Sequence, residues 1–181
     1  MSEDIDKVLP TLGCGLHRIP ITDFLSVKDS SEYYCFEPVI RELLDQIGNP
    51  KGEGLVMDLK IHMLMPKQYP CIPNWHCDLV PRDENGERDF SKVETEKPIY
   101  LWVSGAPLTQ IMLFDGITYS ITPKKWLEID QLTIHRGRPS EEHCWRAFIR
   151  VAHESIMPPN PPDKVNRRHS QVYLDADSFE W

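Results

Sequence analysis

The chain has 181 residues, of which 40% are hydrophobic and 27% are charged, and its formal net charge is −8. These values are typical of one globular domain that can bury a substantial core, and they exclude a disordered chain. No apolar run approaches the roughly 18 residues of a membrane span, and the first residues lack a signal-peptide pattern. We therefore expect a cytoplasmic protein with no membrane partner.

The cysteines and the charge distribution narrow the class further. Five cysteines without a CxxC spacing indicate reduced thiols rather than a disulfide framework. The negative net charge argues against tight, nonspecific binding to a nucleic-acid backbone. Between residues 131 and 170, however, seven Lys and Arg residues outnumber four acidic residues. This local excess would suit a small-molecule or nucleotide-type anionic substrate, and it keeps nucleic acid open as a partner.

We expect a single domain over residues 1–181. Residues 1–50 should form an N-terminal extension with a short edge strand within residues 16–24, where Pro20 is tolerated, and an amphipathic helix. Pro38 at the first turn and Gly48 at the end mark this helix. Residues 55–157 are expected to form a β-rich core and residues 158–181, which begin with four prolines in five positions, a C-terminal tail.

The core is predicted to consist of short strands. Residues 55–65 alternate with a period of two over a long run, which predicts a strand. Asp115-Gly116 between two apolar runs is a strong hairpin signal. Further strands are predicted at residues 99–104, 110–114, 117–121, 126–129, 132–135, 145–152 and 171–174, with a long polar loop at 81–97. One helix followed by about eight strands is the element order of a mostly β jelly roll rather than of an alternating βαβ fold.

The pattern His76-Cys77-Asp78 follows the first long strand after three prolines. In extended chain, residues two apart point to the same face, so His76 and Asp78 can act on one spot while Cys77 turns away. An imidazole and a carboxylate on one face make part of a metal site. A third ligand should come from a later strand, and His135, delivered by the apolar run before it, fits that position.

Two histidines and one carboxylate on one side of an octahedral ion leave the opposite face open. This arrangement is expected for a non-haem Fe(II) oxygenase, and its mixed nitrogen and oxygen ligands suit Fe(II) better than a structural zinc. The common electron donor for such a site is 2-oxoglutarate, whose second carboxylate needs a bidentate cation. Arg146, eleven residues after His135, is the first candidate, and Arg150 on the same strand face is the alternative.

The series His76-x-Asp78, His135, Arg146 resembles the signature of the Fe(II)/2-oxoglutarate-dependent dioxygenases over residues 55–152. The resemblance implies a double-stranded β-helix with an N-terminal helix packed on its major sheet, and it implies iron on the three ligands. Many members carry Ser or Thr two residues after the arginine, whereas this chain has Phe148 there. Residues 71–78 and 166–173 also resemble small members from phage and bacterial genomes.

The substrate is left open among a nucleotide, a nucleic-acid base and a protein side chain. Asn74 and Trp75 beside the first ligand, and Arg136 and Arg138 beside the last, are the candidates for substrate contacts. A base would have to stack on an aromatic ring such as that of Trp75.

Two rival functions fit the same residues. One is a cupin-like metalloenzyme, a hydrolase or isomerase that uses the same ligands without 2-oxoglutarate. The other is a non-catalytic jelly-roll module that binds an anionic ligand in a basic pocket. A zinc site that uses Cys71, His76 or His143 is a third and weaker alternative. The sequence predicts no oligomeric state.

Overall fold

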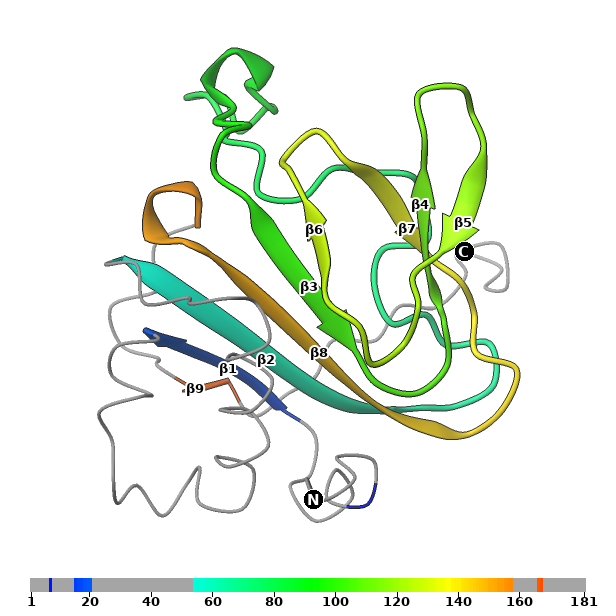
Figure 1. Ribbon diagram of the computed structural model, residues 1–181. Helices are drawn as coiled ribbons and strands as arrows, with labels where there is room; N and C mark the ends of the chain where they lie inside the picture. The colour runs from blue at the N-terminus through cyan, green and yellow to red at the C-terminus, as the bar shows by residue number, and fades with distance from the viewer. Residues whose placement is uncertain (1–6, 8–14, 21–53, 158–165, 168–181) are drawn as a thin grey trace.

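The computed structural model describes residues 7, 15–20, 54–157 and 166–167 (Figure 1). Two antiparallel sheets make up this part of the chain. The larger has six strands in the order β6-β3-β8-β2-β1-β9, and the smaller has three in the order β5-β4-β7. Figure 1 shows β2 and β8 as the longest strands, crossing the molecule side by side, with β4, β5 and β7 gathered beyond β3 and β6.

The strand bounds follow the alternating runs of the sequence closely. The larger sheet contains β1 (Gly15–Pro20), β2 (Leu55–Leu64), β3 (Ile99–Val103), β6 (Leu127–Ile129), β8 (Cys144–His153) and β9 (Asn166–Arg167). The smaller contains β4 (Thr109–Met112), β5 (Thr118–Ser120) and β7 (Ile134–Gly137). Two short 3-10 helices, η1 (Phe90–Lys92) and η2 (Glu154–Ile156), lie between strands. A mostly β chain with two antiparallel sheets is consistent with the jelly roll expected from the element order.

The register of β2 against β8 separates a polar face from an apolar face. Asp58 lies opposite Arg150, Lys60 opposite Phe148 and His62 opposite Arg146. Because directly opposed residues of an antiparallel pair point to the same side, these side chains share one face. The alternate residues form the other face, which is apolar and almost fully buried: Met57, Leu59, Ile61, Ala147, Ile149 and Val151. Both faces of β2 are therefore buried, as expected of a central strand.

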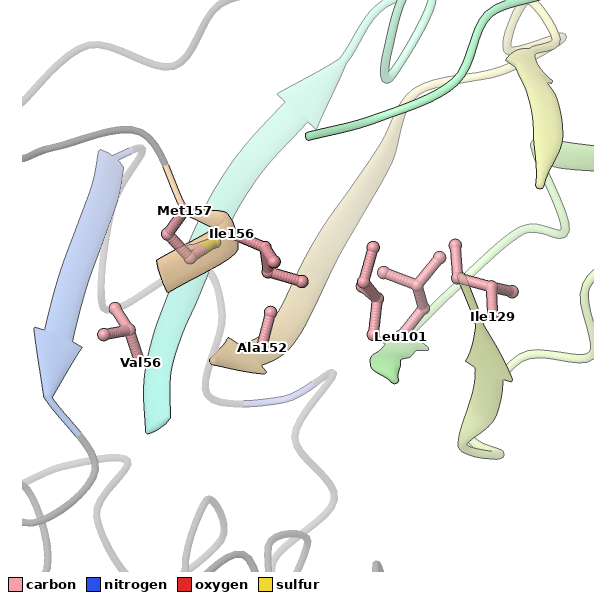
Figure 2. Close-up of a cluster of buried hydrophobic side chains, with 7 residues drawn as sticks. Val56, Leu101, Ile129, Ala152, Ile156 and Met157 are labelled. Atoms are coloured by element: carbon pink, nitrogen blue, oxygen red, sulfur yellow. The ribbon is translucent and has the colours of Figure 1, made fainter. Parts of the chain in front are cut away.

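Apolar side chains of several strands of the larger sheet and of η2 pack into clusters. One cluster contains Val56, Ile99, Leu101, Ile129, Ala152, Ile156 and Met157 (Figure 2). A second cluster joins Val103 of β3 to Ile111 of β4 and to Ile121, so it connects the two sheets. Each such side chain contributes about 1.5–3 kcal/mol when fully buried. This apolar packing fixes the sheets around the polar face of β2 and β8.

Three expectations outside the core have different outcomes. The predicted helix between residues 37 and 48 and the strand at 171–174 lie outside the described residues. The predicted edge strand corresponds to β1, but β1 is paired on both sides, with β2 and with β9, so its assignment to a sheet edge was wrong. Pro20 stands at the last position of the strand, beyond the two residues of β1 that pair with β9, so this end of β1 is a local edge, where proline is tolerated. Within the described ranges, no helix is long and apolar enough to span a bilayer.

Candidate metal centre

Backbone pairing places the His-x-Asp segment beside strand β7. The backbone N–H of His76 donates to the carbonyl of His135 at 2.9 Å, and the N–H of His135 donates back at 2.9 Å. Farther along, Gly137 donates to the carbonyl of Ile72 at 2.9 Å. A Cβ on Gly137 would lie only 2.6 Å from the carbonyl oxygen of Cys71, so glycine is needed for this close approach. The segment thus extends the smaller sheet and fixes both histidines.

The three predicted metal ligands converge on one point. One donor atom from each of His76, Asp78 and His135 lies within 4.8 Å of the others. The Nε2 atom of His76 is 3.6 Å from Oδ1 of Asp78, and that of His135 is 3.6 Å from Oδ2. The two imidazoles are buried, and their ring centroids are 4.4 Å apart. Among the described residues this is the group whose geometry could hold a metal ion.

The protonation of both imidazoles suits metal binding. Nδ1 of His76 is 2.8 Å from the carbonyl oxygen of Asn74, and Nδ1 of His135 is 3.1 Å from that of Thr133. Because a carbonyl oxygen only accepts, each Nδ1 must carry the hydrogen, which leaves the Nε2 lone pairs directed at the shared point. Burial lowers the pKa of His76, so its neutral, ligating form is favoured.

Asp78 is held as a carboxylate by a charge network from the larger sheet. Arg150 donates to Oδ2 of Asp78 at 2.8 Å and to Oδ2 of Asp58 at 2.6 Å. Burial would raise the pKa of Asp78, but the neighbouring His135 and the charge of Arg150 outweigh it and hold the pKa well below its usual range. Arg150 is therefore engaged with these two carboxylates. It orients the predicted ligand Asp78, and its terminal nitrogens are not free to bind the carboxylate of a co-substrate.

A cavity of about 210 Å³ lies between the metal donors and the polar face of β2 and β8. Arg146 reaches into it fully buried, and its Nη2 donates to Oγ1 of Thr109 at 2.9 Å, whereas its Nε has no partner. Burial lowers the pKa of Arg146 to about 10. The same cause, together with the charge of Arg146, lowers the pKa of Lys60 to about 8. We call this space the inner cavity, and its wall is basic.

The inner cavity brings basic side chains into the same space as the three possible metal donors. Its lining includes His76, Asp78 and His135 at one side and Lys60, Thr109 and Arg146 at another. No carboxylate pairs with Arg146 among the described residues, so a buried guanidinium lacks its usual counter-charge. A ligand carboxylate would supply that charge and a partner for Nε.

A second cavity of about 580 Å³ opens on the other side of the donors. It shares His76, Asp78 and Arg150 with the inner cavity, and residues 79–82 and 88 form much of the remaining wall. We call it the outer cavity. Two of the three donors, His76 and Asp78, therefore line both a small basic cavity and a larger one.

The four residues expected to contact substrate do not line either cavity. Trp75 and Arg136 stack on each other, with Cζ of Arg136 4.4 Å from the centre of the Trp75 ring. Each is the chain neighbour of a ligand, and neighbours in extended chain point to opposite faces. Asn74 and Arg138 are exposed. Contact of these four residues with substrate stays a prediction.

Three residues of the site were not singled out from the sequence, namely Asp58, Lys60 and Thr109. A signal for the first two was present, because Asp58, Lys60 and His62 alternate with apolar residues in a long predicted strand. Polar residues on one face of a central strand indicate a polar interior. Thr109 supplies the hydroxyl group that is absent two residues after Arg146.

Searches with protein-family models and against curated proteins found no match to this chain. Among solved structures, a prolyl-4-hydroxylase from Pseudomonas putida is 12% identical, with a TM-score of 0.35, and the match covers 84% of this chain and 92% of that one. A vicilin from Solanum melongena is 16% identical, with a TM-score of 0.36, and the match covers 90% of this chain and 30% of that one. Protein NMB1881 from Neisseria meningitidis is 17% identical, with a TM-score of 0.30, over 55% and 76%. These scores are too low to decide the function, which must be argued from the residues of the site.

Proposed function

We propose that this chain is an Fe(II)- and 2-oxoglutarate-dependent oxygenase that hydroxylates a C–H bond of its substrate. One observation carries the proposal: a His-Asp-His group lines the same small cavity as a buried arginine that has no carboxylate partner among the described residues. The ligand set is the one preferred by non-haem Fe(II) oxygenases, and the cavity supplies what a dicarboxylate co-substrate needs.

The donor set fits the metal, and the roles of the chain's own residues follow. His76, Asp78 and His135 would hold Fe(II), with both imidazoles fixed by their Nδ1–H bonds to carbonyl oxygens. When bound, iron would supply activation of O2: one oxygen atom would enter the succinate formed from 2-oxoglutarate with release of CO2, and the other would enter the C–H bond of the substrate.

The co-substrate would be oriented by the basic wall. Arg146 and Thr109 would bind the carboxylate remote from the metal, and Lys60 would add a second positive charge. The Thr109 hydroxyl accepts from Arg146, so its own hydrogen can be donated to a carboxylate oxygen. Leu101 and Phe148 provide apolar walls that exclude water from the cavity.

The test is an anaerobic titration of the protein with Fe(II) and 2-oxoglutarate, followed by visible absorption. The proposal expects a metal-to-ligand charge-transfer band in the wild type and in His143→Ala, a control at an exposed histidine, but none in His76→Ala. Iron binding without a band would overturn the role of 2-oxoglutarate and favour a metalloenzyme that does not use it. Absence of iron binding would leave a jelly-roll module that binds an anion.

A further inference from the structure

The outer cavity extends well beyond the residues that would hold the metal and the co-substrate. Its volume of about 580 Å³ falls within the roughly 300–1,000 Å³ of small-molecule pockets. It is lined by the metal donors His76 and Asp78 at one side, so a molecule bound in it would lie against the proposed iron site. The chemistry of the residues that line it therefore indicates what kind of substrate could bind there.

One wall is an ordered hairpin that carries two arginines. Arg82 and Arg88 are paired across a β-bridge, and the N–H of Asp83 donates to the carbonyl of Glu87 at 2.8 Å. The Asp83 side chain accepts from the N–H groups of Asn85 and Glu87 at 2.9 Å each. Arg82 also donates to the carbonyl of Gly86. The turn is thus fixed by its own hydrogen bonds, and both arginines are among the residues that line the cavity.

The positive charge of this wall is not neutralised within the cavity. Among the described residues, no hydrogen bond or ion pair involves the side chain of Arg88. Both acidic residues in the lining already have a partner: Asp78 is paired with Arg150 at 2.8 Å, and Glu94 with Lys97, whose Nζ lies 2.6 Å from its carboxylate.

Another part of the lining is apolar, and hydrogen bonds hold it in place. Ile72, Leu79, Val80, Ile156 and Met157 line it. Leu79, directly after the ligand Asp78, has φ of 59°, a left-handed conformation that costs a leucine about 1–3 kcal/mol. Gln131, fully buried, holds it there, because its Nε2 donates to the Leu79 carbonyl while its Oε1 accepts from the N–H of Glu94 at 2.8 Å. A strained backbone conformation at Leu79, directly after the predicted metal ligand Asp78, favours a binding role for this part of the cavity.

We propose that the outer cavity binds the substrate, a small molecule with an aliphatic part on the wall of Leu79 and Ile156 and one anionic group, carboxylate or phosphate, held by Arg82 and Arg88. This inference rests on the proposed function for its chemistry but not for its binding. A net charge of −8 disfavours a polyanion, which makes a nucleic-acid strand a poorer occupant than a small monoanion. The C–H bond to be oxidised would lie in the aliphatic part, near His76 and Asp78.

The experiment measures binding of three simple probes to the isotopically labelled full chain by nuclear magnetic resonance, without metal or 2-oxoglutarate. The probes are octanoate, octyl phosphate and octanol, which share a chain and differ in charge. We expect both anions to shift the amide signals of Leu79, Val80 and Ile156 and to bind about tenfold more tightly than octanol. The better anion identifies the source of the charge as carboxylate or phosphate.

Two variants, one a test and one a control, show whether Arg88 binds the anionic group of the probe. Arg88→Gln should weaken octanoate binding about tenfold and leave octanol binding unchanged, whereas Lys125→Gln, an exposed lysine that lines neither cavity, should change neither. Equal affinity for anions and octanol, shifts confined to the inner cavity, or no binding of any probe would overturn the proposal. A charge-transfer band without probe binding would refute only this inference, and probe binding without a band would refute only the proposed function.

Discussion

At the scale of single residues, the hydroxyl of Thr109 tests whether the inner cavity binds the carboxylate of 2-oxoglutarate. Thr109 is 4% exposed and accepts from Arg146, and valine would keep its shape while removing the hydroxyl. We expect Thr109→Val to weaken 2-oxoglutarate binding about tenfold, because one hydrogen bond to a charged group is lost. Iron affinity should be unchanged. Titration of the charge-transfer band with 2-oxoglutarate measures the first quantity and titration with Fe(II) the second.

Thr118→Val is the control for that substitution. Thr118 is exposed on the edge strand β5 and lines neither cavity. Thr118→Val should therefore leave the affinities for 2-oxoglutarate and for iron unchanged. Loss of iron binding in Thr109→Val would show that the residue supports the metal instead, and an unchanged affinity for 2-oxoglutarate would remove it from the co-substrate site.

His62 makes the stability of the fold depend on pH. Its ring is fully buried with neither nitrogen bonded, and burial, reinforced by Arg146 and Lys60, lowers its pKa to about 2. In the unfolded chain the pKa is about 6.5, so between these values only the unfolded state takes up the proton, and stability falls as the pH falls. From pH 7.5 to pH 5 this residue should remove about 2 kcal/mol from the free energy of unfolding.

Urea unfolding at the two pH values tests the assignment to His62. The difference between pH 7.5 and pH 5 should shrink by about 2 kcal/mol in His62→Leu and stay at the wild-type value in His143→Gln, which changes an exposed histidine. The same pH dependence in His62→Leu and in the wild type would mean that other groups cause it.

The sequence placed some residues of the candidate site better than others. His76, Asp78, His135 and Arg146 carry their own chemical signal, because ligand types at a spacing of two and an arginine on a late strand are visible in the linear chain. The contributions of Asp58 and Thr109 depend on which strand lies beside β8 and in what register. That information is non-local, so the role of Arg150 as the partner of Asp78 could not be predicted either.

At the scale of elements, Gly137 in β7 controls how closely the ligand segment approaches the smaller sheet. In Gly137→Ala the new Cβ would meet the backbone of Cys71 at 2.6 Å, and backbone cannot rotate away as a side chain can. We expect a loss of about 1–3 kcal/mol of stability and at least about a tenfold loss of iron affinity, because His76 would shift relative to His135. Thermal unfolding and Fe(II) titration measure the two effects.

Gly116→Ala provides the control for the same change elsewhere. Gly116 has φ of 82° at an exposed turn with nothing near its position, so alanine there costs about 1–2 kcal/mol of backbone strain alone. Its iron affinity should equal that of the wild type. If Gly137→Ala also lost stability without losing affinity, the close approach would matter for the fold and not for the metal.

Local patterns predicted the strands well and the loops less well. The alternating run at residues 55–65 became β2, and the Asp115-Gly116 signal became the turn between β4 and β5, since both depend on neighbouring residues only. The polar stretch at 81–97 was predicted as a long loop, and the sequence pattern did not indicate the bridged hairpin and the helix η1 within it. Its order comes from side-chain to backbone hydrogen bonds of Asp83 and Asp89, which leave no hydrophobic period.

At the scale of the whole molecule, the order of the strands was beyond the sequence. β8 lies between β3 and β2, so the central pairing joins residues about ninety positions apart. Composition and element order indicate a jelly roll, but nothing in a local window fixes which strands meet. The functional consequence is that Arg150 on the larger sheet pairs with Asp78 beside the smaller one, and the metal site therefore depends on how the two sheets pack.

Only the folded chain brings the donor atoms of His76, Asp78 and His135 together. An ion bound there should therefore stabilise the folded state as a whole. A divalent ion at about 100 times its dissociation constant contributes about 2.7 kcal/mol, which corresponds to a rise in Tm of about 5–10 °C for a chain of this size. Calorimetry with Mn(II), which does not consume co-substrate, measures the shift. His76→Ala should abolish it and His143→Ala should retain it, because only the first residue belongs to the donor group. An equal shift in both variants would place the ion elsewhere and would separate the His-Asp-His group from metal binding.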